Sequence, residues 1–203
     1  SKQIKNKDIS RYKYFFNLPT DGADSMKNLY NFFSDKDDNL YPNYLKYFNS
    51  FGAKPLSPTI FIFDNEITNK DKPVKKFINY VYKTNKPKEK QEKIKLLVDN
   101  LSLEITENLF VVTNKLLEDC EETEMEDLFD DETLGHEEGG KTFSKNGNSE
   151  NHYGKEIFSK FVLKNFEEIN FDNFRPILDN LDKLIMKYKA NVWIEKETKS
   201  LNS

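Results

Sequence analysis

Cysteine, histidine, arginine and long apolar runs are all scarce in this sequence of 203 residues. The one cysteine, Cys120, excludes an intrachain disulfide and a zinc site built from several thiolates, and it agrees with a reducing cytoplasm, the localisation that we expect. No segment approaches the roughly 20 consecutive apolar residues that span a bilayer, and the first ten residues lack the apolar core of a signal peptide. We therefore expect neither a membrane protein nor a secretory precursor.

Aromatic residues are abundant, with 17 Phe and 10 Tyr, although only 36% of the residues are hydrophobic. Large rings build a core from few positions, and the chain is long enough to bury a core without disulfides or metals. We therefore predict a single globular domain over residues 1–193, followed by a polar tail over residues 194–203. The polar and glycine-rich stretch from about 131 to 152 is predicted to form a mobile loop within that domain.

Charge is unevenly distributed along the chain, although the net charge is only -4. The segment Glu118–Glu138 holds twelve acidic residues and no Lys or Arg, and removing that -12 from -4 leaves +8 on the rest. The segment Asn69–Lys95 holds ten lysines against three acids, a net charge of +7. The two segments indicate a cation site beside an anion-binding surface, or else a solvated acidic loop beside a solvated lysine-rich helix.

Hydrophobic patterning divides the chain into strands and helices. Apolar and aromatic runs predict strands over residues 12–18, 58–64 and 109–113. Apolar residues recur at helical spacing over residues 25–33, 41–51, 73–82, 154–166 and 174–188. This alternation predicts an α/β fold with a mainly parallel central sheet flanked by helices.

Acidic residues follow each of the three predicted strands. Asp21 follows the first, Asp64 and Glu66 follow the second, and an acidic stretch with Glu124 and Glu126 follows the third. Parallel strands end at the same rim of a sheet, so these carboxylates are expected to converge where ligands bind in such folds. Clustered negative charges need a cation, and oxygen ligands without His or Cys favour Mg²⁺ or Mn²⁺. The alternative is that each acid belongs to an ordinary solvated turn.

Short motifs in the same order resemble the TOPRIM domain, the metal-binding fold of primases, topoisomerases and overcoming-lysogenization-defect nucleases. They are Asp-Gly at 21–22, Asp-x-acid at 64–66 and Glu-x-Glu-Asp at 124–127. The segments LPTDGADSMKNL, PTIFIFDNE, TEMEDLF, GGKTFSK and HYGKEIFSKFVL are more closely similar to the C-terminal extension of a group of bacterial retron-type reverse transcriptases. The similarity runs from about residue 12 to about residue 178.

The resemblance implies a nuclease that depends on Mg²⁺ or Mn²⁺ and acts in anti-phage defence. The implied metal ligands are Asp21, Asp64, Glu66 and Glu124. Glu126 would add a ligand or orient water, Lys155 would stabilise the phosphodiester transition state, and His152 is a candidate general acid. TOPRIM domains usually have Glu at the position of Asp21 and a second Asp at that of Glu66, so the metal site is either retuned or inactive.

Lysines are the candidate contacts to nucleic acid. The residues concerned are Lys72, Lys75, Lys76, Lys141 and Lys145. Lysine contacts phosphate without reading bases, so we expect binding to DNA or RNA that depends on salt and not on sequence. The resemblance also implies a reverse transcriptase domain in the same polypeptide, and possible association with an ATPase; this sequence itself has no polymerase motif. The alternative function is a non-catalytic module that holds nucleic acid or a partner protein.

Overall fold

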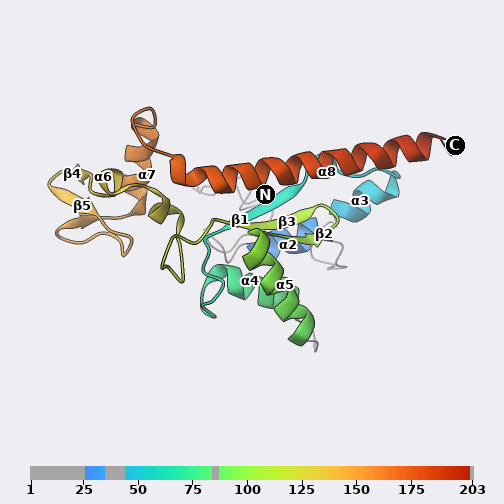
Figure 1. Cartoon of the computed structure of the whole chain (residues 1–203), viewed down its shortest axis with the longest axis horizontal. Helices are drawn as coiled ribbons and strands as arrows, with labels where there is room; N and C mark the ends of the chain where they lie inside the picture. Colours follow the sequence, from blue (N-terminus) through green and yellow to red (C-terminus); the bar gives the residue numbers. More distant parts are fainter. Residues whose placement is uncertain (1–25, 35–43, 84–86, 202–203) are drawn as a thin grey trace, which may run out of the picture.

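The computed structural model describes residues 26–34, 44–83 and 87–201 and shows a mixed α/β protein (Figure 1). The first half contains α2 (Met26–Phe33), α3 (Tyr44–Ser50), β1 (Thr59–Phe63), α4 (Pro73–Val81), α5 (Pro87–Asn100), β2 (Ser102–Thr106) and β3 (Leu109–Thr113). The second half contains the 3-10 helix η2 (Met125–Leu128), α6 (Asp131–Leu134), β4 (Glu137–Glu138), β5 (Lys141–Phe143), β6 (His152–Tyr153), α7 (Lys155–Lys164), the 3-10 helix η3 (Asp172–Phe174) and α8 (Arg175–Leu201). The predicted strand over residues 12–18 lies outside the described residues.

Strands β1, β3 and β2 form a small mixed sheet in that order. β1 runs parallel to β3, with Thr59 opposite Leu109, whereas β2 pairs with β3 in antiparallel orientation. The prediction of a mainly parallel sheet is therefore wrong for the described residues. The cause is a hairpin: a turn at Glu107 and Asn108 joins β2 directly to β3, and no helix intervenes to return the chain in the parallel direction.

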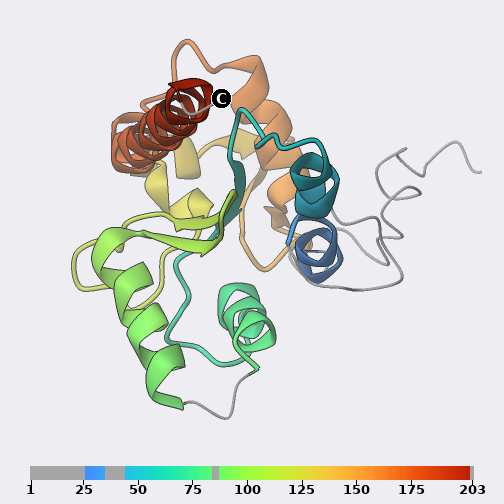
Figure 2. The same cartoon turned by 90° about the vertical axis from the view of Figure 1, so that its right-hand side faces the viewer.

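The sheet lies between two helical layers. α4 and α5 cover one face, and the long helix α8 lies along the other (Figures 1 and 2). On the α4 side, Phe77 packs edge-on against Phe61 of β1, with ring centroids 5.6 Å apart. On the α8 side, Tyr188 contacts Phe110 of β3 at 6.0 Å, and its hydroxyl donates to the carbonyl of Pro55 at 2.8 Å. This packing fixes the ends of β1 and β3, from which the site residues extend.

Residues 131–152, predicted as a mobile loop, contain α6, the short strands β4 and β5, and the first residue of β6. β5 pairs with β4 in antiparallel orientation and with β6 in parallel orientation. Gly139 and Gly140 have φ angles of 59° and 74°, the left-handed conformation that a two-residue hairpin turn requires. Phe143 of β5 stacks on Phe158 of α7 at 4.2 Å, so an aromatic contact anchors this second sheet. The glycines that predicted a loop belong to a hairpin.

Helix α8 is longer than its hydrophobic periodicity predicts. The pattern indicated a helix over residues 174–188 and a polar tail over 194–203, but the helix continues through 27 residues to Leu201. At 1.5 Å per residue it is about 40 Å long, and no proline or glycine interrupts it after Pro176. None of the helices in the described part of the chain is long and apolar enough to cross a membrane.

Candidate functional site

A polar clasp of three buried residues, Asn65, Asn114 and Thr123, holds the acidic segment against the ends of β1 and β3. The N–H of Asn65 donates to the side-chain oxygen of Asn114 at 2.8 Å, and the side-chain amide of Asn114 donates to the carbonyl of Thr123 at 2.9 Å. Backbone hydrogen bonds of 2.9 and 3.0 Å join Asn65 to Thr123. Because residue 123 is tied to the strand ends, the carboxylates that follow it lie beside β1.

Hydrogen bonds from the backbone fix the carboxylates on both sides of this junction. Asp64, directly after β1, accepts a hydrogen bond at Oδ1 from the N–H of Met125 at 2.9 Å. Asp127 accepts one at Oδ2 from the N–H of Glu124 at 2.8 Å, which secures the start of η2. Glu124 and Glu126 are thereby placed next to Asp64, as the sequence predicts.

Lys155, at the start of α7, forms ion pairs with two of these carboxylates. Its Nζ lies 2.9 Å from Oε2 of Glu124 and 2.9 Å from Oε2 of Glu126. Lys155 is the first residue of α7, where the helix dipole disfavours a positive charge, so the ion pairs hold it there against a local preference. The preceding Gly154 packs closely against Gly147, because a Cβ at position 154 would lie 3.1 Å from Cα of Gly147.

Lys72 enters the site from the start of α4. It forms an ion pair with Glu66, and its Nζ also lies 3.7 Å from Oε2 of Glu122 and 3.8 Å from Oε1 of Glu124. The sequence predicts Lys72 as a nucleic-acid contact, but the structure places it among the acids. A third lysine, Lys145, also predicted to contact nucleic acid, lies 2.7 Å from Oδ1 of Asp127.

We call these six acids the carboxylate cluster. Its members are Asp64, Glu66, Glu122, Glu124, Glu126 and Asp127. Three lysines, Lys72, Lys145 and Lys155, form ion pairs with the cluster, so six negative charges against three positive leave -3. Such an excess creates a local attraction for a further cation.

Burial and neighbouring charges alter the acidity of the site. Burial raises the pKa of Asp64, the hydrogen bond from Met125 opposes that rise, and the charges of Glu66 and Glu126 add to it. Burial alone would lower the pKa of Lys155, but its hydrogen bonds to Glu124 and Glu126 outweigh burial and raise it. Lys155 is therefore a fixed positive charge at neutral pH, while ionised Asp64 favours a cation beside it.

A cavity of about 320 Å³ opens beside the cluster. Asp64 and Glu66 line it together with apolar side chains that include Met26, Ile62 and Val74. Glu66 is 4% exposed, so its carboxylate is largely withdrawn from water. A cavity with two acids on an otherwise apolar wall suits a small polar group or a cation more than an apolar ligand.

The donor chemistry of the cluster fits a hard cation, but the arrangement of the described residues does not complete a metal site. Carboxylate oxygens without His or Cys are the ligands of Mg²⁺ and Mn²⁺. Within residues 26–34, 44–83 and 87–201, however, no three Asp, Glu, His or Cys side chains are grouped so that they could hold an ion. Glu66 and Glu124 are engaged with lysines instead, and Asp21, the remaining predicted ligand, lies outside the described residues.

Two other predicted site residues have different partners. Lys141 donates to the carbonyl of Ser149 at 2.8 Å, and Nδ1 of His152 lies 2.9 Å from the hydroxyl of Thr142. In the described structure neither forms a hydrogen bond or an ion pair with the carboxylate cluster. Both residues instead form hydrogen bonds within or next to the second sheet, β4-β5-β6. Among the described residues, no contact supports His152 as a general acid.

Lys75 and Lys76 lie on α4 one turn beyond Lys72. None of the ion pairs among the described residues involves either of them. Burial lowers the pKa of Lys75, and the positive charge of Lys90 on α5 lowers it further. Such a pair is stabilised when a phosphate binds.

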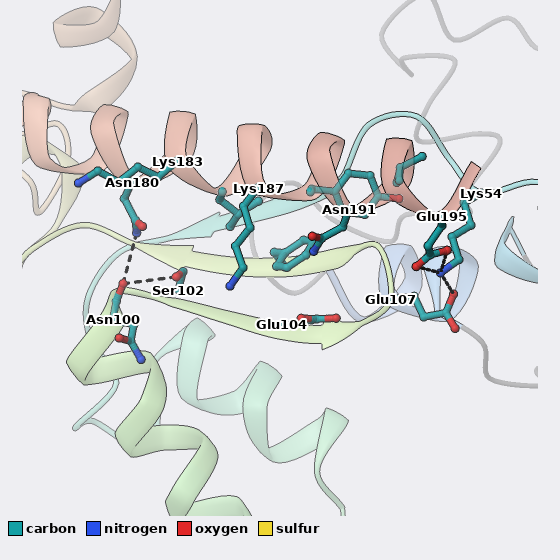
Figure 3. A pocket seen from close by; sticks show the side chains of 14 residues that line it. Lys54, Asn100, Ser102, Glu104, Glu107, Asn180, Lys183, Lys187, Asn191 and Glu195 are labelled. Atoms are coloured by element: carbon teal, nitrogen blue, oxygen red, sulfur yellow. Dashed lines mark hydrogen bonds and ion pairs between the residues drawn. The ribbon is translucent and has the colours of Figure 1, made fainter. Parts of the chain in front are cut away.

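A second and larger hollow lies between α8 and the β2 side of the sheet (Figure 3). It measures about 630 Å³, and no sequence signal indicated it because its walls come from distant segments. Lys54 lies 2.7 Å from Glu195 and 3.8 Å from Glu107 at one end. Its six charged residues are Lys54, Lys183, Lys187, Glu104, Glu107 and Glu195. Three positive charges against three negative leave this groove neutral.

Comparison with known proteins does not assign the chain to a family. No protein-family model matches the chain, and neither does any solved structure. The resemblance to TOPRIM domains therefore stays a prediction from sequence motifs, and the functional argument rests on the geometry of the site.

Proposed function

We propose that this chain is a TOPRIM-like nuclease domain that cleaves phosphodiesters with the help of Mg²⁺ or Mn²⁺. The observation that carries the proposal is the carboxylate cluster. Acids about 60 residues apart in sequence meet at the end of β1, beside a cavity, and an excess of three negative charges remains after their lysine partners are counted. Unneutralised carboxylates held by backbone hydrogen bonds are costly, which favours a cation-dependent role over a purely structural one.

Each residue of the site has a distinct role in this proposal. Asp64, Glu66 and Glu124 would supply oxygen ligands, and Asp21 would add one from outside the described residues. A bound divalent ion neutralises phosphate oxygens and lowers the pKa of water. Lys155, held 2.9 Å from both Glu124 and Glu126, presents a permanent positive charge to the phosphate. Glu126 orients that ammonium and hydrogen-bonds to water.

The substrate surface begins at the cavity and continues along α4. Val74 lines the cavity, and Lys75 and Lys76 follow it directly. The positive charge of Lys90 on α5 acts on Lys75 and lowers its pKa. A row of lysines of this kind attracts the phosphate backbone of DNA or RNA, with an affinity that falls as salt rises.

The biological context of the proposal comes from motif resemblance. The segments similar to retron-type reverse transcriptases favour a nuclease domain that is joined to a reverse transcriptase in one polypeptide and acts in anti-phage defence, with an ATPase as a candidate partner. The polymerase would then reside in that other part of the polypeptide.

Cleavage assays on labelled single-stranded DNA and RNA, with Mn²⁺ or Mg²⁺, test the proposal. Asp64→Asn should lower the cleavage rate about 100-fold or more, since the change keeps the shape of the side chain but removes its charge. The matched control is Glu118→Gln, which removes one exposed acid from the same segment and should leave the rate within about twofold. A wild-type protein that cuts none of these substrates with either ion would refute the nuclease.

One observation favours a second candidate, a non-catalytic module that binds nucleic acid or a partner. Lys72 and Lys155 already form ion pairs with Glu66, Glu124 and Glu126, as they would in a purely structural network. In that case the wild-type protein binds oligonucleotides in a salt-dependent way, binding needs no divalent ion, and Asp64→Asn leaves it unchanged.

A further inference from the structure

Helix α8 has an inner face and an outer face of different character. The inner face carries the buried residues Ile177, Tyr188 and Val192 and is turned towards the body of the protein. At 3.6 residues per turn, positions separated by four, four, three and four residues fall together on the opposite side of the helix. We call this line of residues the α8 stripe. Its members, all exposed, are Leu178, Asp182, Met186, Lys189 and Trp193.

The apolar members of the stripe lie more in water than in the protein. Leu178, Met186 and Trp193 are 58%, 61% and 66% exposed. Single exposed apolar residues are common, but three on the same side of one helix, over about 22 Å, indicate a surface that contacts another protein. Trp193 is the only tryptophan in the chain, and tryptophan is enriched among the residues that contribute most to protein interfaces.

The two charged members of the stripe have no opposite charge near them on α8. Side chains meet along a helix at spacings of three and four residues. No residue at those distances from Asp182 is basic, and none at those distances from Lys189 is acidic. Within the described part of the chain, neither residue takes part in an ion pair. The stripe therefore offers one negative and one positive charge to a partner.

The stripe is complementary to a second copy of itself that runs antiparallel. Its midpoint lies between residues 185 and 186. Leu178 and Trp193 are equally far from that midpoint, on opposite sides of it. The same is true of Asp182 and Lys189. A twofold axis at the midpoint therefore brings Leu178 of one copy to Trp193 of the other, and Asp182 of one copy to Lys189 of the other.

Charge also selects the antiparallel arrangement over the parallel one. A parallel pair in register would place Asp182 against Asp182 and Lys189 against Lys189, and like charges that meet in an interface are costly. The antiparallel pair instead makes two attractive contacts. The stripe repeats after eleven residues, or about three turns, which is close to the period of a straight helix, so both ends of the stripe can stay in contact.

We propose that a second copy of this chain docks on the α8 stripe, so that two α8 helices pair antiparallel in a homodimer. α4 and α5 cover the opposite face of the sheet, so the pairing leaves the basic surface of α4 open on both copies (Figures 1 and 2). A contact between two single helices is smaller than a standard interface, so we expect a reversible dimer with a dissociation constant on the order of 10 μM. The dimer needs neither a metal ion nor nuclease activity, so its failure would leave the proposed function standing.

Sedimentation equilibrium of the whole chain tests the dimer. The wild-type protein should pass from monomer to dimer between about 1 and 100 μM. Trp193→Ala should weaken association about tenfold or more. The matched control is Ile194→Ala, which removes a similarly exposed apolar side chain from α8, one residue outside the stripe, and should change the affinity by about twofold at most. A wild-type protein that stays monomeric at about 500 μM, or equal losses in the two variants, would overturn the proposal.

A charge-exchange experiment tests the antiparallel register. Asp182→Lys and Lys189→Glu each bring like charges together in a homodimer, so each variant alone should associate about tenfold more weakly than the wild-type protein. In an equal mixture, every contact pairs a lysine with an acid, and native mass spectrometry should show heterodimers with an affinity within about threefold of the wild-type value. Such recovery requires both variants to be folded. A mixture as weak as the separate variants, or variants that associate as tightly as the wild-type protein, would refute the register.

Discussion

The carboxylate cluster and the groove beneath α8 both bring opposite charges together, but only the cluster is out of balance. Six acids meet three lysines in the cluster, whereas three acids meet three lysines in the groove. Glu66 in the cluster has a side chain only 5% exposed, whereas Glu107 and Glu195 in the groove are 61% and 47% exposed. Ion pairs between exposed residues contribute little to stability, and equal numbers of acids and lysines leave no net charge for a further ion. The cluster, with one buried acid and five partly exposed ones, keeps a net negative charge that attracts a cation.

The carboxylate cluster and the groove also differ in the buried hydrogen bonds that hold them in place. A substitution in the polar clasp should show that difference. Asn114→Leu removes the two buried hydrogen bonds of the Asn114 side chain, with the N–H of Asn65 and the carbonyl of Thr123, and puts an apolar side chain among buried polar groups. We expect it to lower the free energy of unfolding by about 2–4 kcal/mol, measured by urea denaturation.

The control for the clasp is Asn191→Leu, an amide of the same size in the groove. Asn191 is exposed on α8, and its side chain has no hydrogen-bond partner in the described structure, so its replacement should change the unfolding free energy by about 0.5 kcal/mol or less. Equal losses in the two variants would contradict the view that the acidic segment is anchored more firmly than the groove.

A smaller effect is expected from the raised pKa of Asp64. Its pKa in the folded state lies above the ordinary value of 3.8, so its protonated form is favoured by folding. The stability that this gives is fully present below pH 3.8 and is lost as pH rises through the folded pKa. In metal-free buffer at pH 7, Asp64→Asn should therefore raise Tm by roughly 1–3 °C, and the gain should shrink as pH approaches 4.

The groove again provides the control for this measurement. Glu104→Gln removes one exposed carboxylate that lines the groove, and should shift Tm by about 1 °C or less in the same buffer. An Asp64→Asn variant that is less stable than the wild-type protein at pH 7 would show that the carboxylate supports the fold and is not held at a cost to stability.

The sequence predicts the elements that depend on long or unbroken apolar patterns. β1, β3 and α4 follow from such patterns, and Asp64 and Glu66 follow from their position after β1. β2 was missed because Leu103 and Ile105 alternate over too short a stretch to be distinguished from the end of a helix. The hairpin at Gly139 and Gly140 was missed because glycine marks mobile loops and tight turns alike.

The pairing of charges is the part of the site that sequence patterns do not determine. Lys72 is one of the ten lysines in the segment Asn69–Lys95, and no feature of the neighbouring sequence distinguishes it from Lys75 or Lys76. Its ion pair with Glu66 depends on how the β1–α4 connection folds back. Asn65 and Asn114 were likewise overlooked, although an amide close after each of two neighbouring strands is a signal that could have found the polar clasp.

A double-mutant cycle in Mn²⁺ affinity tests the central claim that acids from separate segments form one cation site. Asp64→Asn and Glu124→Gln should each weaken Mn²⁺ binding about tenfold or more by calorimetry, and the loss in the double variant should differ from the product of the two single losses. That result would show that both carboxylates act on the same ion. Losses that multiply in the double variant, or no loss in either single variant, would contradict the claim.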